Sequence, residues 1–149
     1  MKRRGRPGSS ARIHARGSVS LEFVLVTPFL LMVLFGIVDV SMVLCDKAVI
    51  TNAAGEAARQ GVVLRVPSYT QTQIQNVALA YTKNSLVTSG TATSPTVSVT
   101  PTGGCASAGS SKPLQVNISY TYNGVVLGSA FSVITGPITV KAVAVKNCE

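Results

Sequence analysis

The longest apolar stretch of the chain lies near its N-terminus. Residues 23–38 carry no charged side chain, and residues 40–45 extend this stretch beyond the single acid Asp39. As a helix that rises about 1.5 Å per residue, residues 23–45 would span roughly 34 Å, enough to cross a bilayer with some tilt. Because no proline follows Pro28 until Pro67, the pattern predicts a membrane helix that continues to about Leu64.

The rest of the chain has shorter patterns. Ser68 and Gln71 fit a capping box that starts a second helix, which we expect to end near Val87. Asn123-Gly124 fits a tight hairpin turn, and the Gly/Ser-rich residues 101–113 predict a mobile loop. Alternating apolar and polar residues predict three strands, at residues 96–100, 114–122 and 138–146. We therefore expect an α+β fold with a long N-terminal membrane-spanning helix, a second helix and a small antiparallel sheet.

Positive charge is concentrated before the apolar stretch. Residues 1–16 contain no acid, and from residue 17 onward 7 basic minus 5 acidic residues leave only +2 of the net +8. The basic residues of the N-terminal segment are Lys2, Arg3, Arg4, Arg6, Arg12 and Arg16. Cations at this position keep their end of the chain in the cytoplasm, so we expect the C-terminal part outside. A nucleic-acid arm is the alternative, but the segment has no aromatic residue for base stacking, and we expect no nucleic-acid partner.

Other interpretations of the apolar stretch fit less well. A cleaved secretory signal needs small residues at the cleavage site, and residues 41–48 offer no suitable pair. A lipoprotein site at Cys45 would require Gly or Ala before it, where Leu44 stands. A membrane anchor explains both the length and the flanking charges.

The sequence contains no arrangement typical of an enzyme. The single histidine, His14, lies in the basic segment, so no Ser–His or Cys–His pair and no histidine–cysteine metal site can be built downstream. The carboxylates beyond the apolar stretch, Asp46, Glu56 and Glu149, are too scattered for an acid–base pair. We expect no enzyme activity, no metal and no cofactor.

Two acids at the apolar stretch need an explanation, because a carboxylate in hydrocarbon costs about 2.5–3.5 kcal/mol unless it is paired or shallow. Asp39 fits an interfacial residue that faces the outer water, or a residue used in assembly. Glu22 fits a shallow residue at the cytoplasmic edge, or a partner of another charged group. Both alternatives remain open on composition alone.

Residues around Glu22 resemble a known processing site. Gly17 stands five residues before Glu22, with basic residues upstream and apolar residues downstream, and this order resembles a type IV prepilin cleavage site. Glu22-Phe23 is similar to the pair found in Flp-type pilins of the tight-adherence (Tad) system. The resemblance implies that a prepilin peptidase cuts after Gly17, that Ser18 becomes the first residue, and that Glu22 pairs with the new amine of a neighbouring subunit.

A wider resemblance covers residues 16–61. The segment Phe35-Gly36-Ile37-Val38-Asp39 looks like the TadE-like minor pilins or pseudopilins, which carry an acid near this point. Residues 51–59 look like that family's Asn-Ala-Ala-Arg-Glu-Gly-Ala-Arg stretch, although Gly55 replaces its first Arg and Ala57 its Gly. The resemblance implies assembly roles for Glu22, Phe23 and Asp39.

The same resemblance implies an organisation and a set of partners. The expected parts are a leader at 1–17, a transmembrane and assembly helix at 18–66 and an extracytoplasmic α+β domain at 67–149. The expected partners are the prepilin peptidase, other pilin or pseudopilin subunits, membrane assembly proteins and lipid of the bacterial inner membrane. The function implied is pilus assembly, adhesion or secretion. The alternative is a bitopic membrane protein that does not polymerise and whose outer domain is a scaffold or ligand-binding module.

Small residues recur after the apolar stretch, where helices could approach one another closely. Alanine is also a good helix former, and both explanations remain open at this point. The residues concerned are Ala53, Ala54, Ala57, Ala58 and Gly61.

The three cysteines divide into a pair and a single residue. With the N-terminus in the cytoplasm, Cys105 and Cys148 lie on the oxidising side, where disulfides persist. We expect them to be joined, with a stabilisation of about 4 kcal/mol from loop closure. Cys45 at the membrane edge is then an inert small apolar residue.

Overall fold

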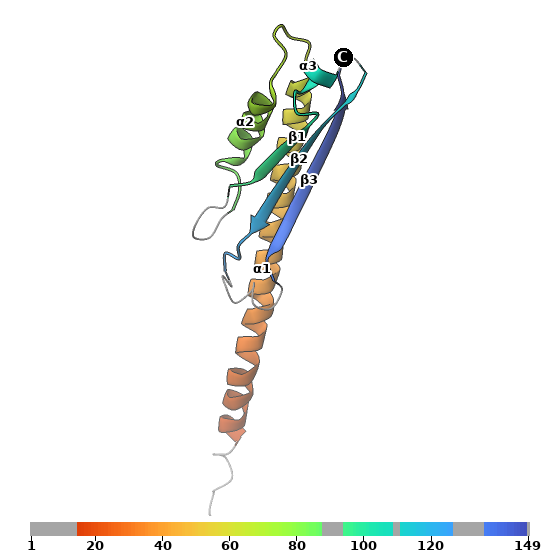
Figure 1. Ribbon diagram of the computed structural model, residues 1–149. Helices are drawn as coiled ribbons and strands as arrows, with labels where there is room; N and C mark the ends of the chain where they lie inside the picture. Colours follow the sequence, from red (N-terminus) through yellow and green to blue (C-terminus); the bar gives the residue numbers. More distant parts are fainter. Residues whose placement is uncertain (1–14, 88–93, 109–110, 127–135, 149) are drawn as a thin grey trace, which may run out of the picture. The chain divides into compact units, whose positions relative to one another are not determined.

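The computed structural model describes residues 15–87, 94–108, 111–126 and 136–148 (Figure 1). Helices and strands alternate irregularly along the chain, so the fold is α+β as predicted. In chain order the elements are α1 (Ala15–Val62), α2 (Gln71–Thr82), β1 (Thr96–Thr100), α3 (Cys105–Ala108), β2 (Pro113–Tyr122) and β3 (Ile138–Asn147).

The chain divides into two compact units, residues 1–35 and residues 36–149. The described part of the first unit is the N-terminal portion of α1, from residue 15 to residue 35. The second unit contains the remainder of α1 and all other elements. Most of the predicted leader lies outside the described residues.

The second unit is built on a three-stranded antiparallel sheet in the order β1-β2-β3. β2 alternates strictly between buried and less buried residues, because successive side chains of a strand point to opposite faces. The register pairs Val116 of β2 with Val99 of β1 and with Ala144 of β3. One face of the sheet therefore enters the core and the other faces outward.

Both long helices cover the inner face of this sheet (Figure 1). α1 contributes one stripe of buried residues and α2 contributes Ile74 and Ala78. The largest buried apolar side chains of the core are Tyr120, Ile50, Ile74, Leu114, Ile118 and Val116. At about 25 cal/mol per Å² of apolar surface removed from water, this packing is the main stabilising term of the second unit.

The capping box of α2 lies two residues later than predicted. The Thr70 hydroxyl accepts from the Gln73 N–H at 3.4 Å, and Gln73 Oε1 accepts from the Thr70 N–H at 2.9 Å. Ser68 instead donates to the Arg65 carbonyl at 3.4 Å, within the turn that follows α1. α2 also ends earlier than expected, at Thr82 rather than near Val87.

The expected tight turn at Asn123-Gly124 is wrong, because β3 begins only at Ile138. The backbone N–H groups of Val125 and Val126, which follow this dipeptide, donate to a side chain of α1. These two N–H groups, which in a tight hairpin would be close to the next strand, therefore bond to α1 instead. Residues 127–135 of the connection lie outside the described residues.

The Gly/Ser-rich segment after β1 is more structured than its composition suggests. It contains the four-residue helix α3, and the Gly104 N–H donates to the Pro101 carbonyl at 2.9 Å. Gly104 has φ +64, and a Cβ added there would lie 2.8 Å from the Tyr69 carbonyl oxygen. Glycine is therefore required at this position for both reasons. Residues 109–110 lie outside the described residues.

Candidate membrane and assembly site

The N-terminal part of α1 exposes large apolar side chains all around the helix. Phe23, Leu25 and Phe29 are each about 70% exposed, and Val24 and Leu30 are also more than half exposed. α1 is the one helix among the described residues that is long and apolar enough to cross a membrane. A helix that is apolar on every face requires an apolar surrounding, which indicates a membrane anchor.

Glu22 and Phe23 lie on this exposed part of α1. Gly17 and Ser18, the residues of the predicted cleavage site, lie in the first turns of the same helix. The structure thus brings the four predicted processing and assembly residues onto one helical segment. Asp39, the third predicted assembly residue, belongs to the second unit.

Asp39 is fully buried, so its interpretation as a residue facing the outer water is wrong. Its Oδ1 accepts hydrogen bonds from the Tyr122 hydroxyl at 3.1 Å and from the N–H groups of Val125 at 3.0 Å and Val126 at 3.1 Å. Asp39 therefore holds the end of β2 and the segment after it against α1. Burial and the bond to Asp39 raise the pKa of Tyr122 to about 12, so its hydroxyl remains a donor at neutral pH.

Asp46, two helical turns after Asp39, is a second buried carboxylate that the sequence analysis did not single out. Its Oδ1 accepts from the Val87 N–H at 2.8 Å, and its Oδ2 is buried without a hydrogen-bond partner among the described residues. The Tyr120 hydroxyl donates to the Val87 carbonyl at 3.4 Å, so Val87 is held from both sides. Asp46 lies in the second unit, beyond the exposed apolar part of α1, and burial raises its pKa above the ordinary value, partly opposed by the Val87 bond.

The spacing of the buried residues on α1 is the signal that could have identified Asp46. Asp39, Asp46, Ile50, Ala53 and Ala57 recur at intervals of three, four or seven residues, which places them on one face of a helix. Both acids thus face the core of the second unit. A hydropathy profile treats them only as interruptions of an apolar stretch.

The small residues of α1 face the core of the same chain. Ala53, Ala54, Ala57 and Ala58 have no exposed surface and belong to one core cluster with the sheet and α2. Gly61 allows a close approach, because a Cβ added there would lie 2.6 Å from Leu114 Cδ2 and 2.9 Å from Ile74 Cδ1. Gly61 therefore packs against β2 and α2 of this chain, and the four alanines belong to the same core.

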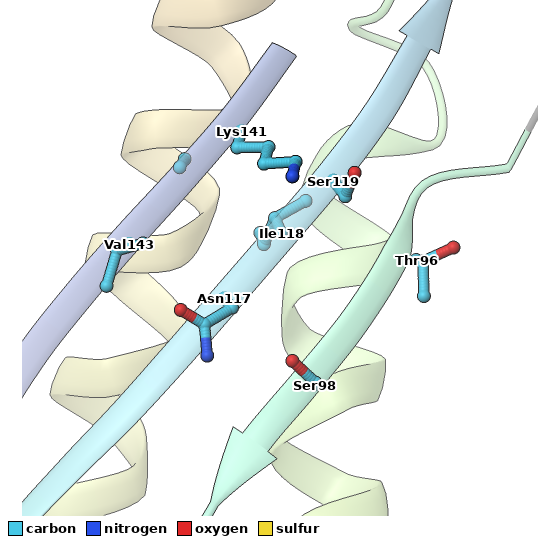
Figure 2. Close-up of a pocket in the computed structure, with 8 residues that line it drawn as sticks. Thr96, Ser98, Asn117, Ile118, Ser119, Lys141 and Val143 are labelled. Atoms are coloured by element: carbon cyan, nitrogen blue, oxygen red, sulfur yellow. The ribbon is translucent and has the colours of Figure 1, made fainter. Parts of the chain in front are cut away.

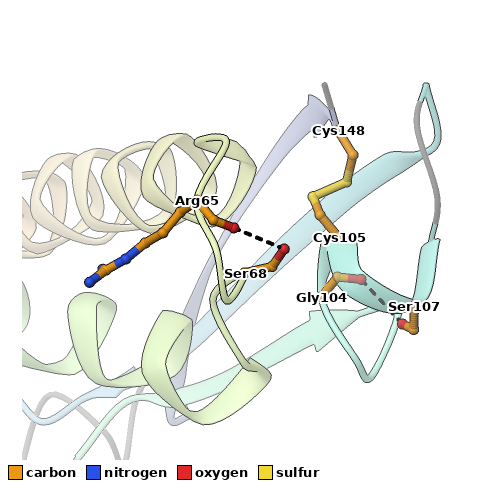
Figure 3. Close-up of a disulfide and its surroundings, with 6 residues drawn as sticks. All are labelled: Arg65, Ser68, Gly104, Cys105, Ser107 and Cys148. Atoms are coloured by element: carbon orange, nitrogen blue, oxygen red, sulfur yellow. Dashed lines mark hydrogen bonds between the residues drawn. A yellow bond between two sulfur atoms is a disulfide. The ribbon is translucent and has the colours of Figure 1, made fainter.

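Cys105 and Cys148 are joined by a disulfide, with 5.6 Å between their Cα atoms (Figure 3). The bond connects α3 to the end of β3. The backbone of Cys148 reinforces this connection, since its N–H donates to the Lys112 carbonyl at 2.9 Å and its carbonyl accepts from the Ser111 N–H at 2.8 Å. Cys45 is free and exposed.

The outer face of the sheet carries a shallow pocket of about 340 Å³ (Figure 2). Side chains from all three strands line it, among them Ser98 of β1, Asn117 and Ser119 of β2, and Lys141 and Val143 of β3. The described residues contain no group of three or more His, Cys, Asp or Glu side chains that could hold a metal ion.

A comparison with known protein families identifies a relative of part of this chain. Residues 17–59 match the family of TadE-like proteins, and this segment covers most of α1, including Glu22, Asp39 and Asp46. Neither the comparison with curated proteins nor that with solved structures gives a match. The family is a structural, non-enzymatic one associated with the Tad pilus. The resemblance seen in the sequence is therefore confirmed for this segment, whose sequence is similar to that of TadE-like proteins.

Proposed function

We propose that the protein is a minor pilin or pseudopilin of a Tad-type (type IVc-like) pilus. One observation carries the proposal: the segment that matches TadE-like proteins, residues 17–59, coincides with a helix whose first part is exposed and apolar on all sides. In this proposal the exposed part of α1 lies in the inner membrane. The second unit then lies on the periplasmic or extracellular side and takes part in pilus assembly, adhesion or secretion.

The proposed orientation follows from the charge distribution. Six basic residues precede α1's apolar part, and only Lys47, Arg59 and Arg65 carry positive charge in the twenty residues after Cys45. Cations near one end of an anchor retain that end in the cytoplasm. The Cys105–Cys148 disulfide supports an outer location of the second unit, because such bonds persist in oxidising compartments.

The proposed maturation is a cut by prepilin peptidase between Gly17 and Ser18. The cut removes all six N-terminal cations and leaves an amine four residues before Glu22. Glu22 and Phe23 then contact other pilin subunits or membrane assembly proteins. Asp39 contributes to assembly by fixing the end of β2 and the segment after it onto the part of α1 within the second unit, through Tyr122, Val125 and Val126.

N-terminal sequencing of the protein purified from membranes tests this function. A mature chain that begins at Ser18 is the expected result, and a chain that keeps Met1 contradicts the pilin proposal. A C-terminal alkaline phosphatase fusion tests orientation separately and should be active in cells. An inactive fusion with an active cytoplasmic reporter at the same position would reverse the topology.

A second candidate is a bitopic membrane protein that does not polymerise and serves as a scaffold or ligand-binding module of a secretion complex. It is favoured by the small residues of α1, since Ala53, Ala54, Ala57 and Ala58 are buried within the chain's own core. These four alanines are therefore not available to a neighbouring helix. An uncut N-terminus together with outer alkaline phosphatase activity would favour this candidate.

A further inference from the structure

β3 forms one edge of the sheet, and within the described parts of the chain no strand pairs with its outer side. β3 spans Ile138–Asn147 and is as long as β2. It pairs with β2 along its whole length without a bulge. An edge strand presents a row of N–H and carbonyl groups that can accept a further strand.

Two sets of hydrogen bonds establish which residues of β3 turn these groups outward. The N–H and carbonyl of Cys148 both bond to residues 111 and 112, on the β2 side. The carbonyl of Lys141 accepts from Lys47 Nζ of α1, away from β2. In a strand the N–H and carbonyl of one residue point to the same side, and successive residues alternate between the two sides. The backbone groups of the odd-numbered residues of β3 therefore point away from β2. Val143 and Val145 are therefore the central residues of the open edge.

The opposite edge of the sheet is already covered. α2 packs against β1, and Gln75 Nε2 donates to the Val97 carbonyl at 3.0 Å. On β3, the carbonyl of Lys141 already accepts a hydrogen bond from Lys47 Nζ. The strand continues beyond Lys141 to Asn147. The two edges thus differ, and the segment from Ala142 onward is the one available for pairing.

The side chains along this edge define the kind of strand that would fit. Val143 and Val145 are 58% and 53% exposed, and no charge lies between Lys141 and Lys146. Val143 and Lys141 also line the shallow pocket on the outer face (Figure 2). The edge therefore offers an apolar centre with a cation at each end.

No acidic side chain of the described second unit neutralises these lysines. Asp39 and Asp46 are buried, and Glu56 on α1 lies 3.9 Å from Arg59 in an ion pair. The outer surface is thus more positive than the net charge of the chain beyond residue 17 suggests, because the buried acids do not reach it. A second copy of the chain would bring the same lysines to the edge and no described acid to pair with them.

We propose that the edge of β3 from Lys141 to Lys146 binds an extended acidic peptide segment of a partner protein by β-augmentation. The partner strand pairs with the outward backbone groups of Val143 and Val145, places β-branched side chains beside theirs, and directs carboxylates toward Lys141 and Lys146. The main-chain bonds supply affinity and the terminal charges supply specificity. The proposal does not depend on membrane insertion or on processing at Gly17.

The test uses the full-length protein in detergent micelles and two synthetic peptides with the same alternating Val/Thr centre. One peptide has Glu at both ends and the other has Lys. The acidic peptide should bind and slow the hydrogen exchange of the Val143 and Val145 amides, which have no partner in the sheet. The Lys peptide should bind at least about tenfold more weakly, because it meets like charges at both ends.

Val143→Pro is the decisive variant, because it removes an N–H that points away from β2 and so leaves the sheet's own ladder unchanged. It should lower the affinity for the acidic peptide about tenfold or more, while Val143→Thr, which keeps the N–H, should bind like the wild type. The double variant Lys141→Gln/Lys146→Gln, which leaves the backbone edge intact, should abolish the preference for the acidic peptide. Protection of the Ala142 and Ala144 amides, which face β2, shows that each variant is folded.

Three results would overturn the proposal. Equal affinity of wild type and Val143→Pro would place the peptide elsewhere, and equal binding of both peptides would remove the charge argument. Protection of Val143 and Val145 that appears without peptide and grows with protein concentration would identify a second copy as the occupant.

Discussion

The Tyr122 hydroxyl donates to Asp39 Oδ1 at 3.1 Å across 83 residues of sequence, and so connects the last residue of β2 to α1. The same oxygen accepts two backbone N–H groups, from Val125 and Val126. A buried carboxylate that satisfies three donors is costly to remove, because the donors are then left without an acceptor. This contact connects the part of α1 that matches TadE-like proteins to the C-terminal sheet, which lies outside the match.

Asp39→Ala should destabilise the second unit by roughly 2–5 kcal/mol, since it leaves buried donors unpaired. Tyr122→Phe removes one donor and keeps the carboxylate and both backbone bonds, so it should cost only about 1 kcal/mol. Chemical denaturation of the full-length protein in detergent, followed by circular dichroism, measures both. If Asp39→Ala is no less stable than Tyr122→Phe, the buried network does not hold the sheet to α1.

Asp46 predicts a dependence of stability on pH. Because burial raises its pKa above 3.8, the folded state binds the proton more tightly than the unfolded state does. Protonation of Asp46 therefore favours the folded state. This contribution to the free energy of unfolding is fully present below the unfolded pKa and is lost as the pH rises through the folded pKa. Asp46→Asn, a neutral isostere that keeps an oxygen for the Val87 N–H, should remove this part of the pH dependence.

The measurement is the denaturation midpoint of wild type and Asp46→Asn across acidic to neutral pH. The variant should be equal to or more stable than the wild type at neutral pH, and the difference should shrink toward acid. A wild type that gains stability relative to the variant as the pH rises would show that Asp46 is stabilised in its ionised form.

The strands were the part of the fold most readily predicted from sequence. β1 has the predicted bounds, and β2 and β3 are each one residue longer than predicted, because the two-residue alternation of a half-buried strand is a local signal. The capping box was misplaced because Ser68/Gln71 and Thr70/Gln73 both satisfy the same spacing. Ile74 and Ala78 stand four residues apart, a spacing that puts both on one helix face, and both are buried.

Asp39 and Asp46 show the limit of the sequence argument. Their helical spacing places them on the buried face, yet their donors come from Tyr122, Val125, Val126 and Val87, far along the chain. A carboxylate near the end of an apolar helix is equally compatible with outer water and with a buried acceptor until those donors are known. The sequence pattern therefore predicted that Asp39 needs an explanation but not which one.

Gly61 and Gly55 form a matched pair on α1. Gly61→Ala would place a Cβ 2.6 Å from Leu114 Cδ2 and 2.9 Å from Ile74 Cδ1, both on fully buried side chains, whereas Gly55 has nothing within 4 Å. Gly55→Ala should gain up to about 1 kcal/mol of helix propensity. Gly61→Ala should be less stable than Gly55→Ala by about 1–3 kcal/mol from overpacking. Equal stability of the two variants would show that the core relaxes around the added methyl.

The disulfide should stabilise the second unit through the unfolded state. Its 43-residue separation corresponds to about 4 kcal/mol in the loop-entropy description. The double variant Cys105→Ser/Cys148→Ser should lose roughly that amount in denaturation, with Cys45→Ser as the control that leaves stability unchanged. Peptide mapping without reductant should show the two cysteine peptides linked, and free thiols at both positions in protein from oxidising cells would contradict the pairing.

The proposed role of Glu22 is tested by comparing it with the cleavage site. Gly17→Asp should keep the leader and prevent assembly. Glu22→Ala should still be cut but enter pili or the assembly complex poorly, because a carboxylate in hydrocarbon favours the one axial position where it meets an amine. Leu21→Ala, a truncation beside Glu22 on the same exposed helix, controls for loss of side-chain bulk and should assemble like the wild type.

The readouts are the mature N-terminus and the amount of protein in sheared pili or in the isolated complex. Normal incorporation of Glu22→Ala would leave the carboxylate without an assembly role, and an uncut wild-type chain would exclude the pilin function itself.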